Sequence, residues 1–243
     1  MTAFLQAVGF LTVLPVGRRA GGAFRPVAAV YFALVGLIIG ALLAAADLAL
    51  AVFPAPLRAI LLVAAWLLLT GALHLDGWID ACDALAPGLS RARARSALQD
   101  PRAGALGVGG AVVLLGTKAA ALASIAEDRA LWIVLATVAS RWAVVMLLVL
   151  APAAGGGDGL GARLAAGLGA RHALLPCLTL AAVLPLVPPL VGAAVVAVVT
   201  VASGVVAGLL ARRIGYLNGD GCGAAIELSE ACVLLLAAAG VRA

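Results

Sequence analysis

The chain has 243 residues, of which 65% are hydrophobic and only 11% are charged, and its formal net charge at pH 7 is +5. Soluble globular domains are about 45–50% apolar and about 25% charged, so this composition excludes a water-soluble globule. The positive charge does not indicate nucleic-acid binding, because most of the arginines lie in loops between apolar segments, as they do in membrane proteins.

Seven apolar segments are candidate transmembrane helices, since about 20 residues cross the hydrocarbon core of a bilayer as a helix. The apolar stretch 4–14 is too short to span and is predicted to form an interfacial or re-entrant helix. The predicted fold is all-α: one integral membrane domain over residues 1–243, built as a polytopic transmembrane helix bundle in contact with the lipid bilayer. The predicted spans are residues 30–52, 57–73, 105–125, 131–151, 173–187, 190–210 and 222–240.

The distribution of arginine predicts how the bundle is oriented. With seven spans, the arginine-rich stretches 18–25, 91–102, 163–171 and 212–213 all fall on one side of the membrane. Apart from the C-terminal Arg242, the opposite side carries only Arg58 and Arg129. Loops rich in arginine stay in the cytoplasm, so this side and the N-terminus are predicted to be cytoplasmic.

The first acidic cluster lies in residues 74–83, which read HLDGWIDACD. Asp76, Asp80 and Asp83 stand at i, i+4 and i+7, a spacing that places them on one face of a helix. Three neighbouring carboxylates repel one another unless they are protonated or meet a cation or a metal. Oxygen ligands suit Mg²⁺, Mn²⁺ or Ca²⁺ better than zinc. A solvated acidic helix end is the alternative, but the residues between the acids are apolar.

A second acidic cluster lies in residues 218–230, which read NGDGCGAAIELSE. Asp220 and Glu227 share a face at helical spacing, and Glu230 continues it. Glu227 and Glu230 enter the last apolar span, where ionisable groups are costly and usually serve function inside a bundle. A protonated, structural hydrogen-bonding carboxyl is the alternative for one of them. The two clusters together predict one metal-dependent active site at the cytoplasmic membrane surface.

Residues 99–110, which read QDPRAGALGVGG, separate the first cluster from the third predicted span. Glycines let backbone N–H groups approach a phosphate, and the N-terminus of a helix favours an anion. Arg102 could add charge-assisted hydrogen bonds to a phosphate. Glycine is also common where membrane helices pack, so this stretch alone does not establish a phosphate site.

Lys118 and Arg141 lie inside predicted spans, where basic side chains need acidic or anionic partners. Arg141 could reach a carboxylate or a substrate, whereas Lys118 could instead extend its ammonium group to the membrane surface. His74 precedes Asp76 by two residues and therefore points to a different part of the helix. It is predicted to neighbour the site, with the roles of general base, hydrogen-bond donor and plain helix-end residue all open.

Taken together, these segments resemble the cobalamin synthase family of adenosylcobinamide-GDP ribazoletransferases. The resemblance rests on residues 71–83 (GALHLDGWIDACD), 99–104 (QDPRAG) and 219–227 (GDGCGAAIE), supported by residues 10–16 (FLTVLPV) and 31–36 (YFALVG).

The chain departs from the family pattern at three positions. The family often has arginine, proline and serine where this chain has Val13, Ala33 and Pro101. The first of these departures affects an expected N-terminal substrate contact, and none of them affects the acidic residues.

The resemblance implies a Mg²⁺-dependent transfer in the bacterial inner (plasma) membrane, and the arginine distribution predicts that the active site is on the cytoplasmic side. A hydroxyl of α-ribazole, or of its 5′-phosphate, attacks the phosphorus attached to cobinamide in adenosylcobinamide-GDP, and GMP leaves. The products are adenosylcobalamin, or its phosphate, and GMP. Nucleic acid is not an expected partner, and association with other cobalamin-pathway enzymes is a further hypothesis.

Roles can be assigned to individual residues on this basis, because phosphoryl transfer needs positioning and charge neutralisation. Asp83 is hypothesised to be the metal ligand nearest the reacting centre, although the sequence does not separate it from Asp80. The predicted metal ligands are Asp76, Asp80, Asp83, Asp220 and Glu227, and the last four are also the predicted catalytic residues. The predicted substrate-binding residues are His74, Asp100, Arg102, Gly104, Lys118 and Arg141.

Two other functions compete with this reading. A CDP-alcohol phosphotransferase also uses spaced aspartates on membrane helices, but the downstream Gly-x-x-x-Asp-x-x-x-Asp of that family does not follow here. An ion-coupled transporter would suit the intramembrane Glu227, Glu230, Arg141 and Lys118. Against a transporter, no inverted repeat is evident and the acids gather toward one surface.

Overall fold

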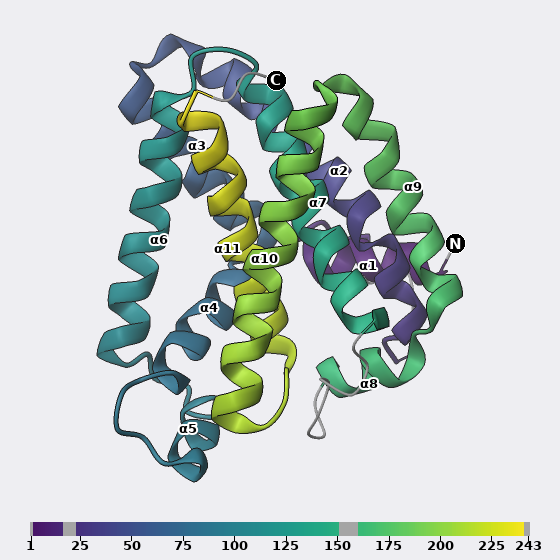
Figure 1. Ribbon diagram of the computed structural model, residues 1–243. Helices are drawn as coiled ribbons and strands as arrows, with labels where there is room; N and C mark the ends of the chain where they lie inside the picture. The colour runs from purple at the N-terminus through teal and green to yellow at the C-terminus, as the bar shows by residue number, and fades with distance from the viewer. Residues whose placement is uncertain (1, 17–22, 151–159, 241–243) are drawn as a thin grey trace.

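The computed structural model describes residues 2–16, 23–150 and 160–240, and every helix and turn of regular structure in these ranges is α or 3₁₀. The predicted all-α class is therefore confirmed, and Figure 1 shows the long helices aligned in one bundle. Asp158, Arg18, Arg19 and Arg242 lie outside the described residues. The α-helices are α1 (Thr2–Leu11), α2 (Phe32–Ala49), α3 (Ala55–Thr70), α4 (Leu73–Ala84), α5 (Arg91–Ala97), α6 (Ala105–Ser124), α7 (Arg129–Leu150), α8 (Leu160–Gly167), α9 (Leu174–Val183), α10 (Pro189–Ile214) and α11 (Gly219–Ala238); the 3₁₀ turns are η2 (Pro26–Tyr31), η3 (Leu50–Val52), η5 (Ala170–Ala173) and η6 (Leu184–Leu186).

The number of membrane-spanning helices is five by length and apolarity among the described residues, or six if the bent pair α3–α4 counts as one span. Seven were predicted. The difference lies in Ala170–Leu186, a shorter apolar helix that ends at the 3₁₀ turn around Pro185. In Figure 1 this segment nevertheless runs from α8 at the lower end of the bundle to the start of α10 at the upper end. The chain is thus a multi-pass membrane protein.

A sharp bend separates α3 from α4. The two helices are inclined at 95°, because Gly71 (φ 60°) and Ala72 (φ 55°) both adopt the left-handed conformation. Glycine adopts this conformation without steric cost, whereas alanine does so rarely. The bend turns α4 away from the direction of α3 and lays it against α6 and α11, where its aspartates are held.

Close packing between α4 and α11 depends on a glycine. A Cβ atom at Gly77 would lie 2.5 Å from the carbonyl oxygen of Asp220, so only glycine allows the two backbones to approach this closely. Small residues that permit such contacts are typical of helix packing in membranes. This contact brings the acidic start of α11 beside the acidic face of α4.

At the end of the bundle where α11 begins, arginines bind the carbonyl groups at helix ends. Arg95 of α5 donates to the carbonyl oxygen of Ile214 at 2.7 and 2.9 Å. Arg213 at the end of α10 donates to the carbonyl oxygens of Ala84 and Ala86. These contacts satisfy carbonyls that have no partner within their own helices, and they fix α5 and α10 beside the end of α4.

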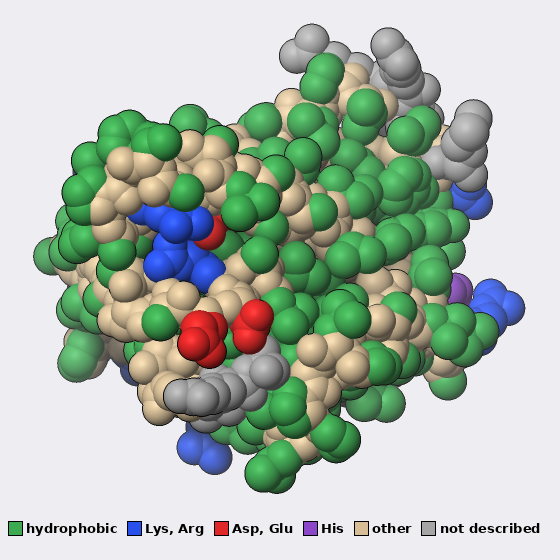
Figure 2. Space-filling model, turned by 90° about the horizontal axis from the view of Figure 1, so that it is seen from above, with side chains coloured by type: hydrophobic (Ala, Val, Ile, Leu, Met, Phe, Trp, Pro, Cys, Tyr) green, Lys and Arg blue, Asp and Glu red, His purple; other side chains and the backbone are tan. Residues whose placement is uncertain are grey.

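At the opposite end, the view in Figure 2 shows a face covered mostly by hydrophobic side chains, with a small group of charged side chains among them. Asp47, near the end of α2, accepts two hydrogen bonds from Arg58 at 2.5 and 2.7 Å. Arg129, at the start of α7, lies 3.4 Å from the same carboxylate. The two arginines predicted on this side therefore hold the ends of α2, α3 and α7 together.

Helix α1 runs crosswise to the long helices in Figure 1. Its Phe10 packs against Phe24 and Phe32, with ring centroids 4.9 and 5.9 Å apart, and Phe4 packs edge-on against Tyr31 at 5.7 Å. A short helix was predicted at 4–14, and the structure places it at Thr2–Leu11. Its interfacial or re-entrant position remains a prediction.

Candidate active site

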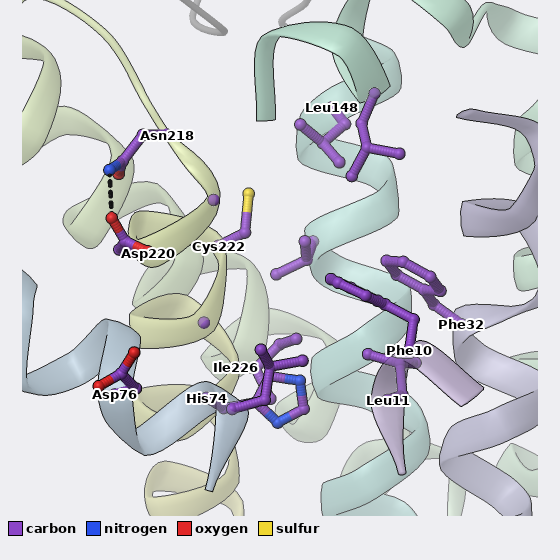
Figure 3. Close-up of a pocket in the computed structure, with 15 residues that line it drawn as sticks. Phe10, Leu11, Phe32, His74, Asp76, Leu148, Asn218, Asp220, Cys222 and Ile226 are labelled. Atoms are coloured by element: carbon purple, nitrogen blue, oxygen red, sulfur yellow. Dashed lines mark hydrogen bonds between the residues drawn. The ribbon is translucent and has the colours of Figure 1, made fainter. Parts of the chain in front are cut away.

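Two cavities meet at Asp76, on the first turn of α4. We call the first the aromatic cavity: it has a volume of about 290 Å³ and is the one drawn in Figure 3. We call the second the acidic cavity: its volume is about 240 Å³. The aromatic cavity is lined by Phe10, Leu11, Phe32, Leu73, His74, Asp76, Val144, Leu148, Leu164, Asn218, Gly219, Asp220, Cys222, Gly223 and Ile226, and the acidic cavity by Asp76, Ile79, Asp80, Leu98, Gln99, Asp100, Pro101 and Ala103.

Three carboxylates gather where the two cavities adjoin. Asp80 is close enough to Asp220 and Asp76, and to Asp83 with a smaller effect, to interact electrostatically with each of them. Asp76 interacts in the same way with Asp220. Within the described ranges, none of the three forms an ion pair with a basic side chain. Carboxylates that repel one another without a basic partner favour a bound cation.

Asn218 holds Asp220 in place. The residue is the N-cap of α11: its side-chain oxygen accepts a hydrogen bond from the N–H of Gly221 at 2.9 Å, as asparagine commonly does at this position. Its amide nitrogen donates to the Asp220 carboxylate at 2.6 Å. Figure 3 shows the two side chains together at one side of the aromatic cavity.

Asp83 has a different environment. Its two carboxylate oxygens accept hydrogen bonds from the N–H groups of Gly104 and Gly107, at 2.7 and 2.8 Å. The first N–H groups of a helix have no partner within the helix, and a negative charge there is favourable. Asp83 thus anchors the N-terminus of α6, and it lines neither cavity. The predicted substrate-binding residue Gly104 donates its N–H to this carboxylate.

Glu227 lies in a buried group of charged side chains on α6, α7 and α11. Lys118 donates hydrogen bonds to Glu227 and, at 2.6 Å, to Glu230. Arg141 donates to the other oxygen of Glu230. The ammonium group of Lys118 also lies 4.9 Å from the ring centroid of Trp66. Glu227 lines neither of the two cavities.

The five carboxylates predicted to share a metal therefore have three different environments. In the described ranges, no three His, Cys, Asp or Glu side chains are already arranged to hold an ion. The spacing of seven residues explains why Glu227 is separated from Asp220: it keeps the same helix face but moves about 10 Å along the axis. Asp76, Asp80 and Asp220 are the part of the predicted set that remains together.

The predicted partners of the intramembrane cations are partly confirmed. Arg141 reaches a carboxylate, that of Glu230, and its second amino group lies 3.3 Å from Nδ1 of His74. Lys118 is only 2% exposed and binds two glutamates, so its side chain does not extend to the membrane surface. Their binding of substrate remains a prediction.

Asp100 and Arg102 pair with each other in the loop before α6. Arg102 donates to Asp100 through its backbone N–H at 3.0 Å and through its guanidinium group at 2.9 and 3.0 Å. These hydrogen bonds lower the pKa of the Asp100 carboxyl to about 2. Asp100 lines the acidic cavity, and Arg102 is exposed beside it. The phosphate contact of Arg102 and the binding of substrate by Asp100 both remain predictions.

Sequence reasoning missed several residues that line the cavities. Asn218 was recognisable, because asparagine directly before a glycine-rich helix start is a common N-cap. Gln99 was part of a quoted motif but received no role. Phe10 and Phe32 carried no signal, since a phenylalanine in an apolar stretch is expected to pack in the core.

Comparison with known proteins gives the same family over nearly the whole chain. The family model described as cobalamin-5-phosphate synthase matches residues 3–238. A relative named adenosylcobinamide-GDP ribazoletransferase from Brevibacillus brevis is 34% identical over 240 residues, which cover 97% of this chain and 97% of the relative. A relative of the same name from Pseudomonas putida (strain GB-1) is 38% identical over 247 residues, with 99% and 100% covered.

A third relative of that name, from Geotalea daltonii, is 34% identical over 214 residues, which cover 87% of this chain and 86% of the relative. No solved structure gives a significant match. The full-length matches agree with the motifs around Asp76, Asp100 and Asp220, and the chain therefore belongs to the cobalamin-5-phosphate synthase family.

Proposed function

We propose that this chain is an adenosylcobinamide-GDP ribazoletransferase that joins adenosylcobinamide-GDP to α-ribazole, or to its 5′-phosphate, late in cobalamin biosynthesis. The observation that carries the proposal is a group of three carboxylates at the junction of two cavities in a member of this family: Asp76, Asp80 and Asp220 form no ion pair within the described ranges. Adjoining cavities suit a reaction between two substrates, and the carboxylates suit the diphosphate chemistry.

The proposed reaction forms one P–O bond and breaks another. The hydroxyl oxygen of the ribazole bonds to the phosphorus that carries cobinamide. The bond from that phosphorus to the oxygen that bridges the two phosphates breaks, and its electron pair leaves with GMP. The hydroxyl proton passes to a carboxylate. Asp76 is the proposed acceptor, because it alone lines both cavities and so lies where the two substrates would meet.

Magnesium is the proposed cofactor. Asp76, Asp80 and Asp220 offer the oxygen ligands that Mg²⁺ prefers, and they lack a basic partner in the described part of the chain. When bound, the ion would neutralise charge on the diphosphate and on the departing GMP. The carboxylates' own task is then to place the phosphates beside the ribazole hydroxyl and to accept its proton.

We place the protein in the bacterial inner membrane with this site on the cytoplasmic side. The arginines of α5 and of the last turn of α10 lie at the end of the bundle that carries α5 and the loop after it (Figure 1), and this loop lines the acidic cavity. Arginine-rich loops remain cytoplasmic. GMP would then be released into the cytoplasm. Binding of other cobalamin-pathway enzymes at this face is part of the same hypothesis.

The test is an assay of the purified protein in liposomes. We expect equal amounts of GMP and corrinoid product to form from adenosylcobinamide-GDP and α-ribazole with Mg²⁺. Chelation should stop the reaction, and Mg²⁺ should restore it. If the substrates were taken up into the liposomes without GMP release, a transporter would replace the proposal. Full activity in the presence of chelator would contradict the role of the metal.

A further inference from the structure

The walls of the aromatic cavity differ from one end to the other. Figure 3 shows Asp76, Asn218 and Asp220 at one side and Phe10, Leu11 and Phe32 at the other. The rings of Phe10 and Phe32 are nearly parallel, with an interplanar angle of 17°. Such a cavity fits a ligand with a flat apolar part and a polar part.

His74 provides one unused polar group in this cavity. The side chain is 3% exposed and lies between the carboxylate end and the aromatic end in Figure 3. Its Nδ1 lies 3.3 Å from the Arg141 guanidinium. Because a guanidinium group only donates hydrogen bonds, Nδ1 must accept, and the ring proton is then on Nε2.

The Nε2 atom is buried and has no hydrogen-bond partner within the described residues. Buried polar groups are almost always paired, and leaving a donor unpaired is costly. His74 is one of the residues that line the aromatic cavity, so an unpaired donor on its side chain points to an acceptor atom on a ligand. This second observation is independent of the aromatic walls.

We propose that the aromatic cavity binds the benzimidazole base of the acceptor nucleoside, between the Phe10–Phe32 wall and the Nε2–H of His74. The inference rests on the proposed function and adds where one substrate lies. Benzimidazole consists of two fused, largely apolar rings, and its unsubstituted ring nitrogen accepts one hydrogen bond. With the base in this position, the sugar of the nucleoside extends toward Asp76 and Asp220.

The other parts of the two substrates fit this cavity less well. A corrin macrocycle is far larger than a bicyclic base and exceeds a cavity of about 290 Å³. Guanine carries several donors and acceptors on its edges, whereas the described residues at the aromatic end of the cavity offer one unpaired donor, Nε2 of His74. Burying guanine there would leave polar groups unpaired. The corrinoid and the guanosine diphosphate are thus assigned to the acidic cavity side of Asp76.

Binding measurements with two nucleosides test the hydrogen bond from His74. Calorimetry would compare α-ribazole with an indole riboside, which has C–H in place of the acceptor nitrogen. The wild type should bind α-ribazole about five- to tenfold more tightly, the effect of one hydrogen bond. His74→Leu should bind both ligands equally. Comparing two ligands within each protein cancels any general effect of the substitution on folding. An unchanged preference in His74→Leu would overturn the proposal.

Kinetics test the aromatic wall. Phe10→Leu should raise KM for α-ribazole severalfold and leave KM for adenosylcobinamide-GDP unchanged. The matched control is Phe4→Leu on the same helix, since Phe4 packs against Tyr31 outside the cavity. A rise in KM for the corrinoid instead, or competition by GMP for ribazole binding, would place another substrate here. If the wild type preferred α-ribazole to the indole riboside but released no GMP, the proposed function would be contradicted, whereas the proposed binding site for the benzimidazole base would be supported.

Discussion

Residues of the same chemical type have different surroundings along one short helix. On α4, Asp76 and Asp80 line a cavity and have no basic partner among the described residues, whereas Asp83 is hydrogen-bonded to the start of α6. The i, i+4, i+7 spacing predicts that the three share a helix face, and the helix itself is confirmed. The spacing does not predict which element packs against each turn of that face. The role of each aspartate depends on that neighbouring element.

Asp76 should be the carboxylate most sensitive to substitution. Asp76→Asn keeps the shape of the side chain but removes its charge and its ability to accept a proton. We expect GMP release to fall by at least about 100-fold, as for the loss of a general base, while thermal unfolding in detergent stays unchanged. Glu127→Gln, an exposed acid after the far end of α6, is the control and should retain full turnover. Near-normal turnover in Asp76→Asn would contradict the assigned role.

Asp83 should matter for stability more than for chemistry. Asp83→Ala removes the acceptor for two backbone N–H groups, and we expect the free energy of unfolding to fall by about 1–3 kcal/mol. Asp83→Asn keeps one acceptor oxygen, so its free energy of unfolding should fall less than that of Asp83→Ala. Denaturation in detergent measures the loss, and KM for both substrates should change little in the protein that remains folded. If Asp83→Asn were fully stable but inactive, the earlier hypothesis that Asp83 binds the metal nearest the reacting centre would regain support.

At the scale of the elements, three helices are joined by a group of buried charges. The group consists of Lys118 of α6, Arg141 of α7 and the two glutamates Glu227 and Glu230 of α11. They form three ion pairs, in which Lys118 and Glu230 each have two partners. The sequence singles out each of these residues because charges inside a membrane are costly. It leaves open a structural role for one of the glutamates and an extended, surface-reaching position for Lys118. In the structure these four side chains form ion pairs with one another. Their first effect is therefore to fix the register of the three helices.

Removing one member of this group should leave another charge buried without a partner. Lys118→Met is expected to destabilise the protein by about 3–5 kcal/mol, the typical cost of breaking a buried pair. Combining it with Glu227→Gln should recover part of the loss, because the uncompensated carboxylate is then neutral. A double-mutant cycle in detergent measures this coupling. Losses that simply add would show that Lys118 and Glu227 do not depend on each other.

The contact between α4 and α11 can be tested at a glycine. Gly77→Ala places a methyl group against the backbone of Asp220, so the two helices must separate. We expect a loss of about 1–3 kcal/mol and a fall in turnover, because the three carboxylates move apart. Gly109→Ala on α6 is the matched control, since nothing lies within 4 Å of its added methyl group. Equal effects of the two substitutions would mean that close packing of α4 on α11 does not hold the site.

The helices were easier to predict than the bend and the cavities. Apolar length predicts α2, α6, α7, α10 and α11 closely, because each must bury its own backbone in lipid. The 95° turn after Thr70 was missed, since it depends on left-handed conformations at Gly71 and at Ala72, and alanine gives no signal of this. The aromatic cavity was missed for a related reason: its walls come from α1, α2, α4, α7, α8 and α11, and only the packed bundle shows that they meet.

For the whole molecule, the two ends of the bundle differ in chemistry. One end carries the acidic cavity and the arginines of α5 and α10, whereas the other carries the compact group of Asp47, Arg58 and Arg129. Helix α6 connects them: Asp100 precedes its start and Glu127 follows its end. Its 20 residues extend about 30 Å, the thickness of a hydrocarbon core. Substrates that enter from opposite sides of the membrane would therefore reach different ends.

Single cysteines can determine which end faces the cytoplasm. Arg93→Cys on α5 places an exposed thiol at the end with the acidic cavity, and Glu127→Cys after α6 places one at the opposite end. In a background without the native cysteines, an impermeant maleimide should label Glu127→Cys in intact spheroplasts and Arg93→Cys only in inverted membrane vesicles. The arginine distribution predicts this result, because moving the arginines of α5 and α10 across the membrane would be costly. The reverse labelling would put the acidic cavity outside the cell, where GMP would be lost, and would contradict both the orientation and the proposed cytoplasmic reaction.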